Sequence, residues 1–465
     1  MINQYNTPTI AIIGGGFCGT MVAVHLLRQS APVRIVLINS RYPLSKGIAY
    51  SSYSNKHLLN VPAKNMGAFP ENPGHFIEWL KNHENYGVLD AQELPDMYLP
   101  RNIYGQYLKD IFENAIRRKT QNVSIEFVHD VAIDLSKLND AYQVHFSVSP
   151  PIIVNKVVLA MGNHIPRDPE FGNTQFVSSK RYFPNPWLKE AVNHPEKESN
   201  ILIVGNGLTM VDVVLGLREN GFTGKIYSLS PHGFKILPHR KFEPYKKMTD
   251  ELQKPFKLND LVGLFRKHVA ILRAENKSAE AIVDSFRPLT QKVWKELSSG
   301  EKRRFLYHLR HMWGVARHRL PMQIHKEIQQ LILDDKLEII AGKIEYAFDK
   351  ENYAEINIRR RYKNEILQLN VDRVINCTGP ESNINKMSDS LIKNLLATGM
   401  IQADEFFLGI NATEDGQILG KSNLPEKNIL TLGTWMKGVL WESTAIPELR
   451  NQAKSVANQL IVEFV

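Results

Sequence analysis

The chain has 465 residues, of which 43% are hydrophobic and 23% charged, a composition that is typical of soluble globular proteins. This length is too great for one compact core, so roughly two or three domains are expected. The formal net charge of +9 suits anionic ligands such as dinucleotide phosphates or acidic substrates, and over so long a chain it does not predict nucleic-acid binding.

The N-terminal stretch and the cysteines exclude further classes of protein. Residues 1–9 are polar and uncharged, and the apolar run 10–13 ends in glycines, so no signal peptide or membrane span is predicted and a cytoplasmic location is expected. Cys18 and Cys377 are the only cysteines and form no Cys-x-x-Cys motif. The sequence therefore predicts no disulfide framework, no metal site and no pair of redox-active thiols.

The start of the chain predicts a strand at 10–13, a helix at 17–29 and a second strand at 33–38. The same order recurs near the middle of the chain, at 201–204, 208–218 and 225–229. Two such strand–helix–strand units predict two bound dinucleotides.

The rest of the chain predicts a helical segment followed by strands. Residues 240–330 are basic, with apolar residues at helical spacing in 258–272 and 303–313, which indicates a helical insertion. After it, apolar runs indicate strands, and the chain ends on a predicted helix at 443–460. The predicted strands are 337–340, 344–348, 355–360 and 366–376.

Gly14, Gly16 and Gly19 form a G-x-G-x-x-G motif directly after the first predicted strand and at the start of a helix. The first glycine permits a tight turn, the second lets the backbone approach a pyrophosphate, and the third allows close packing of helix and strand. The phosphates would lie at the positive end of that helix. Asn39 ends the second strand in place of the usual acidic residue, and its amide could bind a ribose hydroxyl.

The second motif keeps Gly205 and Gly207 but has Met210 where the third glycine would stand. We interpret Asp212 on the following helix as a capping or surface group. No acidic residue follows the second strand of this unit, which slightly favours NADPH over NADH, although a solvated basic loop would look the same. The polar and basic residues found there instead are Ser230, His232, Lys235, His239, Arg240 and Lys241.

Two further glycines, Gly162 and Gly379, end apolar strands in small-residue turns. Such turns let the backbone come close to a cofactor, although any buried strand that ends in glycine has the same pattern.

A long, ordered series of segments resembles the bacterial FAD/NAD(P)-binding family that includes FAD-dependent urate hydroxylase and aspartate N-monooxygenase. The resemblance covers nearly the whole chain and is weakest in the helical insertion. The segments that carry it are 46–51, 57–63, Met66, 69–70, 75–80, 99–101, 104–108, the second glycine motif, Trp313, 317–319 and 440–450.

This resemblance implies an α/β, two-dinucleotide-binding (Rossmann-like) flavoprotein that binds FAD and NADPH or NADH. The FAD-binding domain would comprise 1–195 and 371–465, the NAD(P)-binding domain 196–240 and 331–370, and the helical insertion 241–330. The residues implied near FAD are His57, Asn60, Arg101, Trp441, Ser443 and Thr444, and each could equally be a packed polar residue or, for the last two, a helix cap.

The candidates for binding an anionic substrate are Trp313, Arg317 and Arg319, because a guanidinium can grip a carboxylate or phosphate through two hydrogen bonds. The alternative is that Trp313 belongs to a core and that the arginines pair with acidic neighbours. No catalytic acid or base can be identified from the sequence.

Three functions fit these features. The first is a monooxygenase that hydroxylates a small anionic or amino-containing metabolite through a flavin hydroperoxide. The second is an NAD(P)H oxidase or reductase that passes electrons to oxygen, a quinone or a partner, and the third is a non-catalytic flavin-binding redox sensor. The partner expected in each enzyme case is a small molecule and neither nucleic acid nor membrane, and the oligomeric state is not predicted.

Overall fold

The computed structural model describes residues 7–87, 90, 92–363 and 365–461, so part of the N-terminal stretch considered above lies outside the described residues. The chain divides into two compact units. Unit 1 comprises Met1–Asn55, Val61–His164 and Glu381–Val465, and unit 2 comprises Lys56–Asn60 and Ile165–Pro380.

Unit 1 is built on a sheet whose described strands run in the order β15-β16-β7-β1-β2-β3. All neighbours pair in parallel except β15, which is antiparallel to β16. The central strand β1 is buried along its whole length, as its run of isoleucines and alanine predicts. The strands are β1 (Thr9–Ile13), β2 (Val33–Ile38), β3 (Val123–Val128), β7 (Lys156–Leu159), β15 (Gln417–Leu419) and β16 (Pro425–Thr431).

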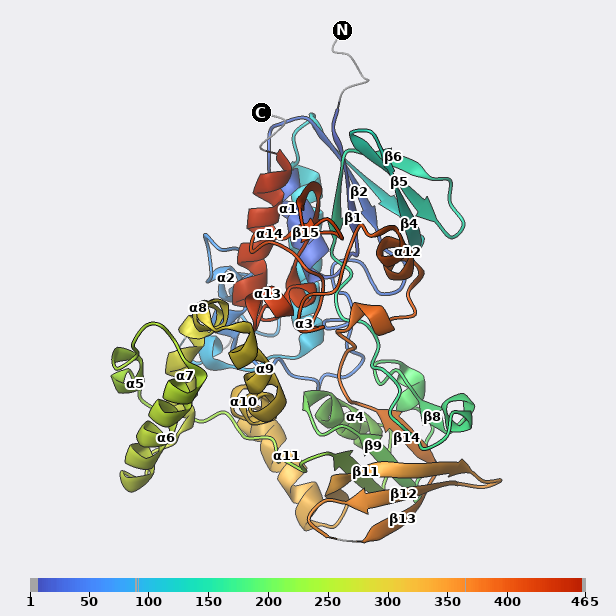
Figure 1. Cartoon of the computed structure of the whole chain (residues 1–465), viewed down its shortest axis with the longest axis vertical. Coiled ribbons are helices and arrows are strands. Elements are labelled where there is room, and N and C mark those ends of the chain that lie inside the picture. Colours follow the sequence, from blue (N-terminus) through green and yellow to red (C-terminus); the bar gives the residue numbers. More distant parts are fainter. Residues whose placement is uncertain (1–6, 88–89, 91, 364, 462–465) are drawn as a thin grey trace. The chain divides into compact units, whose positions relative to one another are not determined.

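Helices and a small antiparallel sheet cover the unit 1 sheet. Helix α1 is buried on nearly all sides because it packs against both α3 and α14. On the other side, α12 packs against β4 of the small sheet β4-β5-β6 (Figure 1). These elements are α1 (Phe17–Leu27), α2 (His75–Lys81), α3 (Arg101–Arg118), α12 (Ser390–Thr398), α13 (Lys437–Leu440), α14 (Ile446–Ile461), β4 (Ala132–Leu138), β5 (Ala141–Phe146) and β6 (Ile152–Val154).

Unit 2 contains a sheet whose described strands run in the order β13-β12-β11-β10-β9-β14-β8. Strands β11, β10, β9, β14 and β8 are parallel, whereas β12 and β13 extend the sheet as antiparallel strands. The elements are β8 (Tyr182–Phe183), β9 (Asn200–Val204), α4 (Leu208–Glu219), β10 (Lys225–Ser230), β11 (Leu337–Asp349), β12 (Ala354–Arg360), β13 (Ile366–Val371) and β14 (Arg373–Asn376).

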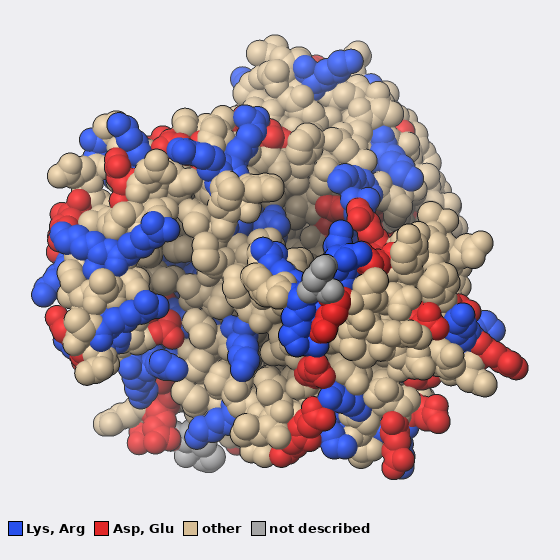
Figure 2. All heavy atoms as spheres, turned by 60° about the horizontal axis from the view of Figure 1, so that its bottom comes forward, with Lys and Arg blue, Asp and Glu red and all other residues tan. Residues whose placement is uncertain are grey.

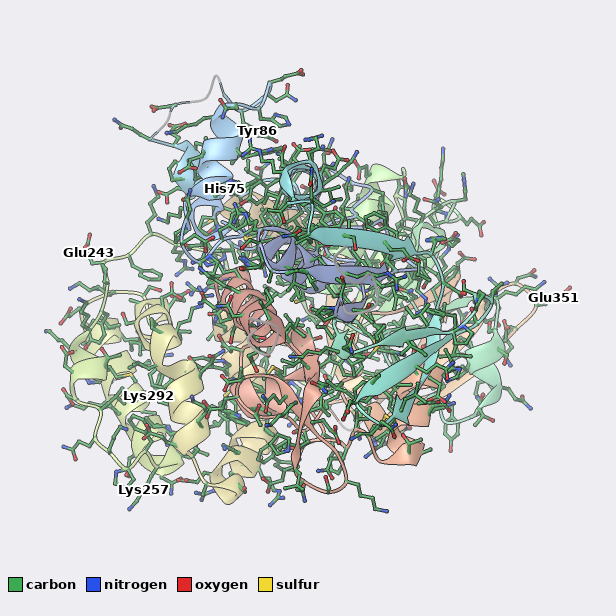
Figure 3. All side chains as sticks on the ribbon, turned by 90° about the horizontal axis from the view of Figure 1, so that it is seen from above. His75, Tyr86, Glu243, Lys257, Lys292 and Glu351 are labelled. Carbon is green, nitrogen blue, oxygen red and sulfur yellow. The ribbon has the colours of Figure 1, made fainter. Side chains whose placement is uncertain are left out.

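A helical segment within unit 2 has an apolar core of its own, in which Phe256, Leu272 and Phe286 are buried. Lys257 and Lys292 are exposed on its outer side, as expected for amphipathic helices (Figure 3). The helices are α5 (Lys247–Asp250), α6 (Leu258–Ala274), α7 (Glu280–Phe286), α8 (Thr290–Glu296), α9 (Ser299–His308), α10 (Arg310–Arg317) and α11 (Met322–Leu333).

The bounds of the compact units differ from the predicted domain bounds. Residues 165–195 and 371–380, which the sequence assigned to the FAD-binding domain, belong to unit 2. The reason is hydrogen bonding, because β14 pairs in parallel with β9 and β8 pairs with β14. The predicted insertion also lies within unit 2, as does the short segment Lys56–Asn60.

Three predicted elements differ in detail. The single helix predicted over 303–313 is interrupted at Leu309, which separates α9 from α10. The strands predicted at 337–340 and 344–348 form one strand, β11, whose register shifts between Ile344 and Tyr346. The segment predicted as one strand over 366–376 forms two strands, β13 and β14, which are separated at Asp372. In the strand order of the sheet they lie toward opposite edges.

Charge is dispersed over the face of the molecule shown in Figure 2, where Lys and Arg side chains alternate with Asp and Glu. Among the described residues, no helix is both long and apolar enough to cross a membrane.

Candidate functional site

The first glycine motif forms a tight turn between β1 and α1. Gly14 has a φ of +111°, and its N–H donates to the carbonyl of Ile38 over 2.9 Å. A Cβ on Gly14 would lie 2.3 Å from the carbonyl oxygen of Ala160, so no side chain fits. A Cβ on Gly19 would lie 1.9 Å from the carbonyl oxygen of Gly14, which explains why helix and strand pack so closely here.

Gly16 is different, because nothing in the chain excludes a side chain from it. Its φ is −79°, and an added Cβ would meet only the Cα of Gly47, at an ordinary contact distance of 3.7 Å. Gly16 is also the N-cap residue of α1, and no side chain caps that helix end. The turn therefore leaves an open backbone surface at the N-terminus of a helix, which is the arrangement that accepts a phosphate.

The segment around Ser45 lies against this turn, and the sequence did not single it out. Ser45 adopts a φ of +67°, and its N–H donates to the carbonyl of Gly15 over 2.8 Å. Its side chain is 1% exposed, and its hydroxyl has no hydrogen-bond partner among the described residues. A buried hydroxyl without a partner beside an open glycine turn fits a site where a ligand supplies the missing hydrogen bond.

The side-chain amide of Asn39 holds the turn through two hydrogen bonds. Its Oδ1 accepts from the N–H of Gly15 at 3.2 Å, and its Nδ2 donates to the carbonyl of Tyr42 at 2.8 Å. The amide is thus engaged in holding the motif, and its predicted contact with a ribose hydroxyl stays a prediction.

The second glycine motif repeats the geometry of the first in unit 2. Gly205 has a φ of +113°, its N–H donates to the carbonyl of Leu229 at 2.7 Å, and an added Cβ would lie 2.2 Å from the carbonyl oxygen of Cys377. Gly207 is the N-cap residue of α4, and nothing lies within 4 Å of an added Cβ. Met210, at the position of the third glycine, is buried.

The prediction that Asp212 is a capping or surface group is wrong, because Asp212 is 7% exposed inside α4. The carbonyl of Asp212 lies 2.9 Å from Nε2 of the buried His57, so this imidazole carries its proton on Nε2. Asn60 likewise accepts from Nε2 of His239 through its carbonyl, at 3.0 Å. Both contacts lie within unit 2, and the predicted contact of each residue with FAD stays a prediction.

The segment near the C-terminus lies against the first glycine motif, and its predicted approach to the flavin stays a prediction. The Sγ of Cys18 lies 3.1 Å from the position of an added Cβ on Gly433, and Thr434 donates to the carbonyl of Gly162 at 3.1 Å. Ser443 is fully buried and donates to the carbonyl of Gly433 at 2.7 Å, so it closes this loop.

The helix predicted over 443–460 begins at Ile446, so Ser443 and Thr444 lie before it. Trp441 is half-buried and Thr444 is exposed. Gly162 and Gly379 both have positive φ angles, and nothing lies within 4 Å of an added Cβ at either, so both turns are open.

Arg101 begins α3 next to an aromatic cluster. Burial raises the pKa of the Tyr50 hydroxyl, and the nearby Arg101 guanidinium partly offsets this effect. The rings of Tyr50 and Tyr104 pack edge to face at 4.6 Å. His75 begins α2 (Figure 3) beside the same cluster, with its Nδ1 3.0 Å from the hydroxyl oxygen of Tyr107.

Two of the three substrate candidates, Trp313 and Arg319, make structural contacts. Trp313 packs edge to face against Phe265 and Phe286, in the core of the helical segment. Arg319 is 2% exposed and forms an ion pair with Asp284, whereas Arg317 is half-buried at the end of α10. For Trp313 and Arg319 these contacts fit the alternative considered above, and a role in ligand binding stays a prediction for all three residues.

Burial affects the ionisation of both cysteines. Burial raises the pKa of the Cys18 thiol to about 12, and burial also raises the pKa of the Cys377 thiol well above its usual value. Both therefore remain protonated near neutral pH, and a protonated thiol is a poor nucleophile. In the described parts of the chain, no three His, Cys, Asp or Glu residues are grouped so as to hold a metal ion.

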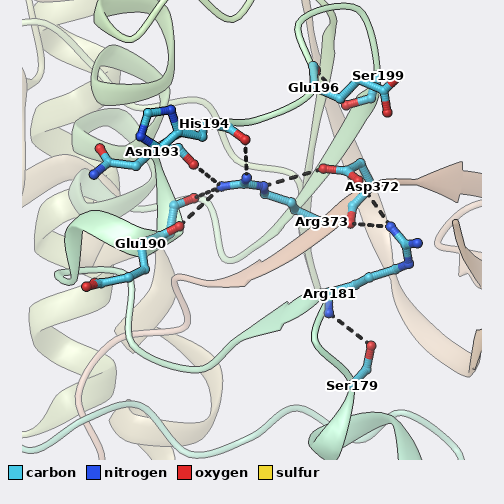
Figure 4. A network of polar contacts seen from close by, with 10 residues as sticks. Ser179, Arg181, Glu190, Asn193, His194, Glu196, Ser199, Asp372 and Arg373 are labelled. Carbon is cyan, nitrogen blue, oxygen red and sulfur yellow. Dashed lines mark hydrogen bonds and ion pairs between the residues drawn. The ribbon is translucent and has the colours of Figure 1, made fainter. Parts of the chain in front are cut away.

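One cavity, of about 580 Å³, lies beside β8 and β14. Its walls include Arg181, Asp372 and Arg373, but these side chains already satisfy one another and the backbone (Figure 4). Arg373 donates to the carbonyls of Asn193 and His194, each at 2.8 Å, and Arg181 pairs with Asp372 at 3.1 Å. This cavity is therefore a structural junction at the sheet edge.

A family model covers the first glycine turn and the residues that follow it. Residues 11–164 match a family model described as FAD-NAD(P)-binding. No curated protein sequence matches the chain.

Several solved structures match almost the whole chain. Ornithine hydroxylase from Pseudomonas aeruginosa, in its reduced form, has a TM-score of 0.67 at 14% identity, covering 98% of this chain and 99% of that one. L-lysine 6-monooxygenase from Pseudomonas syringae has a TM-score of 0.66 at 15% identity, with the same coverage. Ornithine N-hydroxylase from Kutzneria sp. 744, with reduced FAD, NADP+ and L-ornithine, has a TM-score of 0.62 at 14% identity and 99% coverage of both chains.

These matches agree in architecture with the two sheets described above. The chain therefore has an α/β, Rossmann-like two-dinucleotide fold of the kind found in FAD/NAD(P)-binding flavoprotein monooxygenases.

Proposed function

We propose that the chain is an FAD- and NAD(P)H-dependent monooxygenase that hydroxylates a small amino-containing metabolite. FAD would bind at the glycine turn of unit 1, and the nicotinamide nucleotide at the glycine turn of unit 2. When bound, FAD supplies the redox chemistry, since it accepts hydride from the nicotinamide and reacts with oxygen.

The observation that carries this proposal is the repeated open glycine. Gly14 and Gly205 are required by the chain itself, because an added Cβ would overlap a carbonyl oxygen in each case. Gly16 and Gly207 are not required by any contact in the chain, yet both stand at the N-cap of the helix that follows. A bound molecule would explain why glycine stands at both positions, and a pyrophosphate at a helix N-terminus fits each of them.

The residues of unit 1 fit FAD beyond the glycines. The backbone of Gly15 and Gly16 would face the pyrophosphate, and the Ser45 hydroxyl would gain the partner that it lacks. Arg101, at the start of α3, could pair with a phosphate or approach the flavin edge, as the family resemblance implies.

The substrate class rests on the structural relatives and on charge. Two of the relatives are named for hydroxylation of ornithine and one for monooxygenation of lysine. The family resemblance adds aspartate and urate, and the net charge of +9 suits a carboxylate-bearing substrate. An amino acid combines both features, so ornithine, lysine and aspartate are the first substrates to test, followed by urate.

Reduction of a disulfide by the chain's own thiols is not favoured. That chemistry needs two thiols that exchange electrons, whereas burial raises the pKa of both the Cys18 and the Cys377 thiol and so keeps each protonated. Simple NAD(P)H oxidation by oxygen remains as an outcome that the experiment must separate from hydroxylation.

The experiment begins with purified protein and its absorbance spectrum, in which bound FAD is expected. NADPH oxidation, oxygen uptake and hydrogen peroxide are then measured with and without each candidate substrate. A hydroxylating enzyme should consume NADPH faster with its substrate and form a hydroxylated product in place of hydrogen peroxide. Stoichiometric hydrogen peroxide with every substrate would identify an oxidase, and protein that binds no FAD would overturn the proposal.

A further inference from the structure

A row of aromatic rings in unit 1 begins beside the first glycine motif. An added Cβ on Gly47 would lie 3.0 Å from the Cα of Gly16, so the segment that carries Gly47 rests on the open part of the turn. Three residues later, the Tyr50 ring packs edge to face on Tyr104 of α3, with centroids 4.6 Å apart. The row therefore starts beside the turn to which FAD is assigned.

From Tyr104 the row continues to helix α2. The ring centroids of Tyr104 and Tyr107 are 5.3 Å apart, and those of Tyr107 and Trp79 are 5.6 Å apart. Both tyrosines are fully buried, whereas Trp79 is half-buried. The His83 ring, 5.0 Å from Trp79, then leads over 5.3 Å to Tyr86, which follows the end of α2 (Figure 3). Every step lies within the range of direct ring contact, so the row joins the core of unit 1 to its surface.

Tyrosine and tryptophan are the aromatic side chains that give up one electron most readily. A tyrosine radical that keeps its hydroxyl proton is a very strong acid, so a phenol is oxidised readily only if that proton leaves with the electron. A buried tyrosine can therefore hold a radical only where a base lies within hydrogen-bond reach of its hydroxyl.

Tyr107 has such a base, whereas Tyr104 has none. The Nδ1 of His75 lies 3.0 Å from the Tyr107 hydroxyl oxygen, and this oxygen accepts the N–H of Ala68 at 3.1 Å, which leaves the O–H to donate to the imidazole. Burial lowers the pKa of His75, so the ring is neutral at pH 7 and its Nδ1 can take up a proton. The buried Tyr104 hydroxyl has no hydrogen-bond partner among the described residues.

Trp79 also has a proton acceptor. Its Nε1 donates to Oδ2 of Asp110 at 2.9 Å, and Gln106 donates to the other oxygen of that carboxylate at 2.8 Å. A carboxylate at this distance stabilises positive charge on the indole and can take up the N–H proton. Tyr107 and Trp79 are thus two sites that can each hold a radical, whereas Tyr104 supplies only a ring between the cofactor turn and Tyr107.

We propose that Tyr107 and Trp79 carry oxidising equivalents from the FAD site to the surface of unit 1, and that they protect the site from oxygen-centred radicals. The inference rests on the proposed function, because such radicals arise where oxygen is reduced and no substrate is hydroxylated. It assigns a second, protective activity to side chains that would otherwise be only an aromatic core.

Electrons and protons balance in each step. An oxygen-centred radical takes one electron from Tyr107 and one proton from water, and the Tyr107 hydroxyl proton moves to Nδ1 of His75. Trp79 then gives one electron to Tyr107, and its indole proton moves to Asp110. Tyr107 recovers its own proton from His75. Ascorbate in solution finally returns an electron to Trp79, and Asp110 returns the indole proton.

The test uses blue light, which makes the bound FAD a one-electron oxidant, and follows the radicals by transient absorbance and electron paramagnetic resonance. In the FAD-loaded wild type, a tyrosyl radical should precede a tryptophanyl radical that ascorbate removes. Tyr107→Phe should lower the yield of both radicals by about tenfold, and Trp79→Phe should leave a tyrosyl radical that ascorbate reduces about tenfold more slowly. His75→Leu should slow formation of the tyrosyl radical by about a hundredfold, as expected for loss of a positioned base.

A second measurement counts the NADPH that each protein oxidises without substrate before half of its activity is lost. Tyr107→Phe and Trp79→Phe should each be inactivated after fewer turnovers than the wild type, because radicals that are not carried away oxidise the site itself. Melting temperatures show whether each variant is folded. Trp79 and His75 are half-buried, so their variants keep the test informative if Tyr107→Phe unfolds.

The matched control is Tyr104→Phe, which removes a hydroxyl from the same cluster but keeps the ring between Tyr50 and Tyr107. Because this hydroxyl has no partner, radical yields and the NADPH count should change by less than about twofold.

Equal losses in Tyr104→Phe and Tyr107→Phe would overturn the inference and leave the proposed function intact. So would a wild-type protein that binds FAD but forms neither radical in light. Absence of bound FAD in the wild type would overturn the proposed function itself.

Discussion

Two glycines of the first motif are needed for different physical reasons, and substitution can separate them. Gly14→Ala places a Cβ 2.3 Å from the carbonyl oxygen of Ala160 at a φ of +111°, so it should destabilise the fold by roughly 2–4 kcal/mol. Gly16→Ala meets only an ordinary contact and should fold normally, but its Cβ would occupy space that a pyrophosphate needs.

We therefore expect Gly16→Ala to keep its melting temperature as apoprotein and to lose FAD affinity by about tenfold or more. The measurements are the absorbance spectrum and titration of the apoprotein with FAD. Fully loaded Gly16→Ala protein would show that the pyrophosphate lies elsewhere.

The buried His25, in the last turn of α1, should make the folded protein less stable in acid. Its side chain is 5% exposed, and burial lowers its pKa from 6.5 to about 4. In the unfolded chain the imidazole protonates near pH 6.5, so between pH 6.5 and 4 the unfolded state binds more protons and stability falls with falling pH. At pH 5 this one group should lower stability by about 2 kcal/mol relative to pH 8.

The measurement is the melting temperature from pH 8 to 5, for wild type and for His25→Leu, which cannot take up the proton. The variant should lose less stability than the wild type over that range. Parallel curves for the two proteins would contradict the assignment, and His145→Leu provides a control at a partly exposed histidine.

Single residues were predicted well where backbone geometry alone decides their role. The glycine pattern predicted tight turns at Gly14 and Gly205, and both turns are present because strand, turn and helix are all local in sequence. Ser45 could not be found in this way, because its position beside Gly15 depends on a loop that folds back across the motif. The ion pair of Arg319 could not be found in this way either, because its partner Asp284 is distant in sequence. Arg319 was therefore named as a ligand candidate.

Elements were predicted best where one apolar run makes one buried strand. Strand β2 has the predicted bounds, and β1 and β9 differ by one residue. The prediction of one strand over 366–376 was wrong, because the apolar pattern continues through Asp372 whereas the hydrogen bonds between β13 and β12 do not. The N–H of Asp372 donates to the carbonyl of Asn200, which ends β13, and β14 then pairs with β9.

The interruption at Leu309 has a similar cause. Apolar spacing continues across it, so the sequence indicates one helix from 303 to 313. In the structure, Trp313 packs on Phe265 and Phe286, whereas Phe305 of α9 packs on Trp294. Two different sets of core partners set the directions of α9 and α10, and such long-range packing is not encoded in the local pattern.

On the scale of the whole molecule, the same turn occurs once in each unit. In unit 1 the first glycine contacts the residue after β7, and in unit 2 it contacts the residue after β14. Both neighbouring strands pair in parallel with the strand that carries the glycines. Because each turn is complete within its own unit, the two cofactor sites should be separable by substitution.

This separability gives the last prediction. Gly207→Ala adds a methyl group where no atom of the chain lies within 4 Å, so the fold and the FAD content should be those of the wild type. Its effect should fall on the nicotinamide nucleotide alone, with NADPH affinity about tenfold weaker and flavin reduction correspondingly slower at low NADPH. Rapid mixing of the oxidised protein with NADPH measures this rate, and Gly263→Ala, another uncrowded glycine on α6, serves as the control. The two variants serve as controls for each other, because Gly16→Ala should lose FAD, whereas Gly207→Ala should lose only the response to NADPH. Loss of FAD from Gly207→Ala, or its reduction at the wild-type rate under limiting NADPH, would mean that the two turns do not serve separate cofactors.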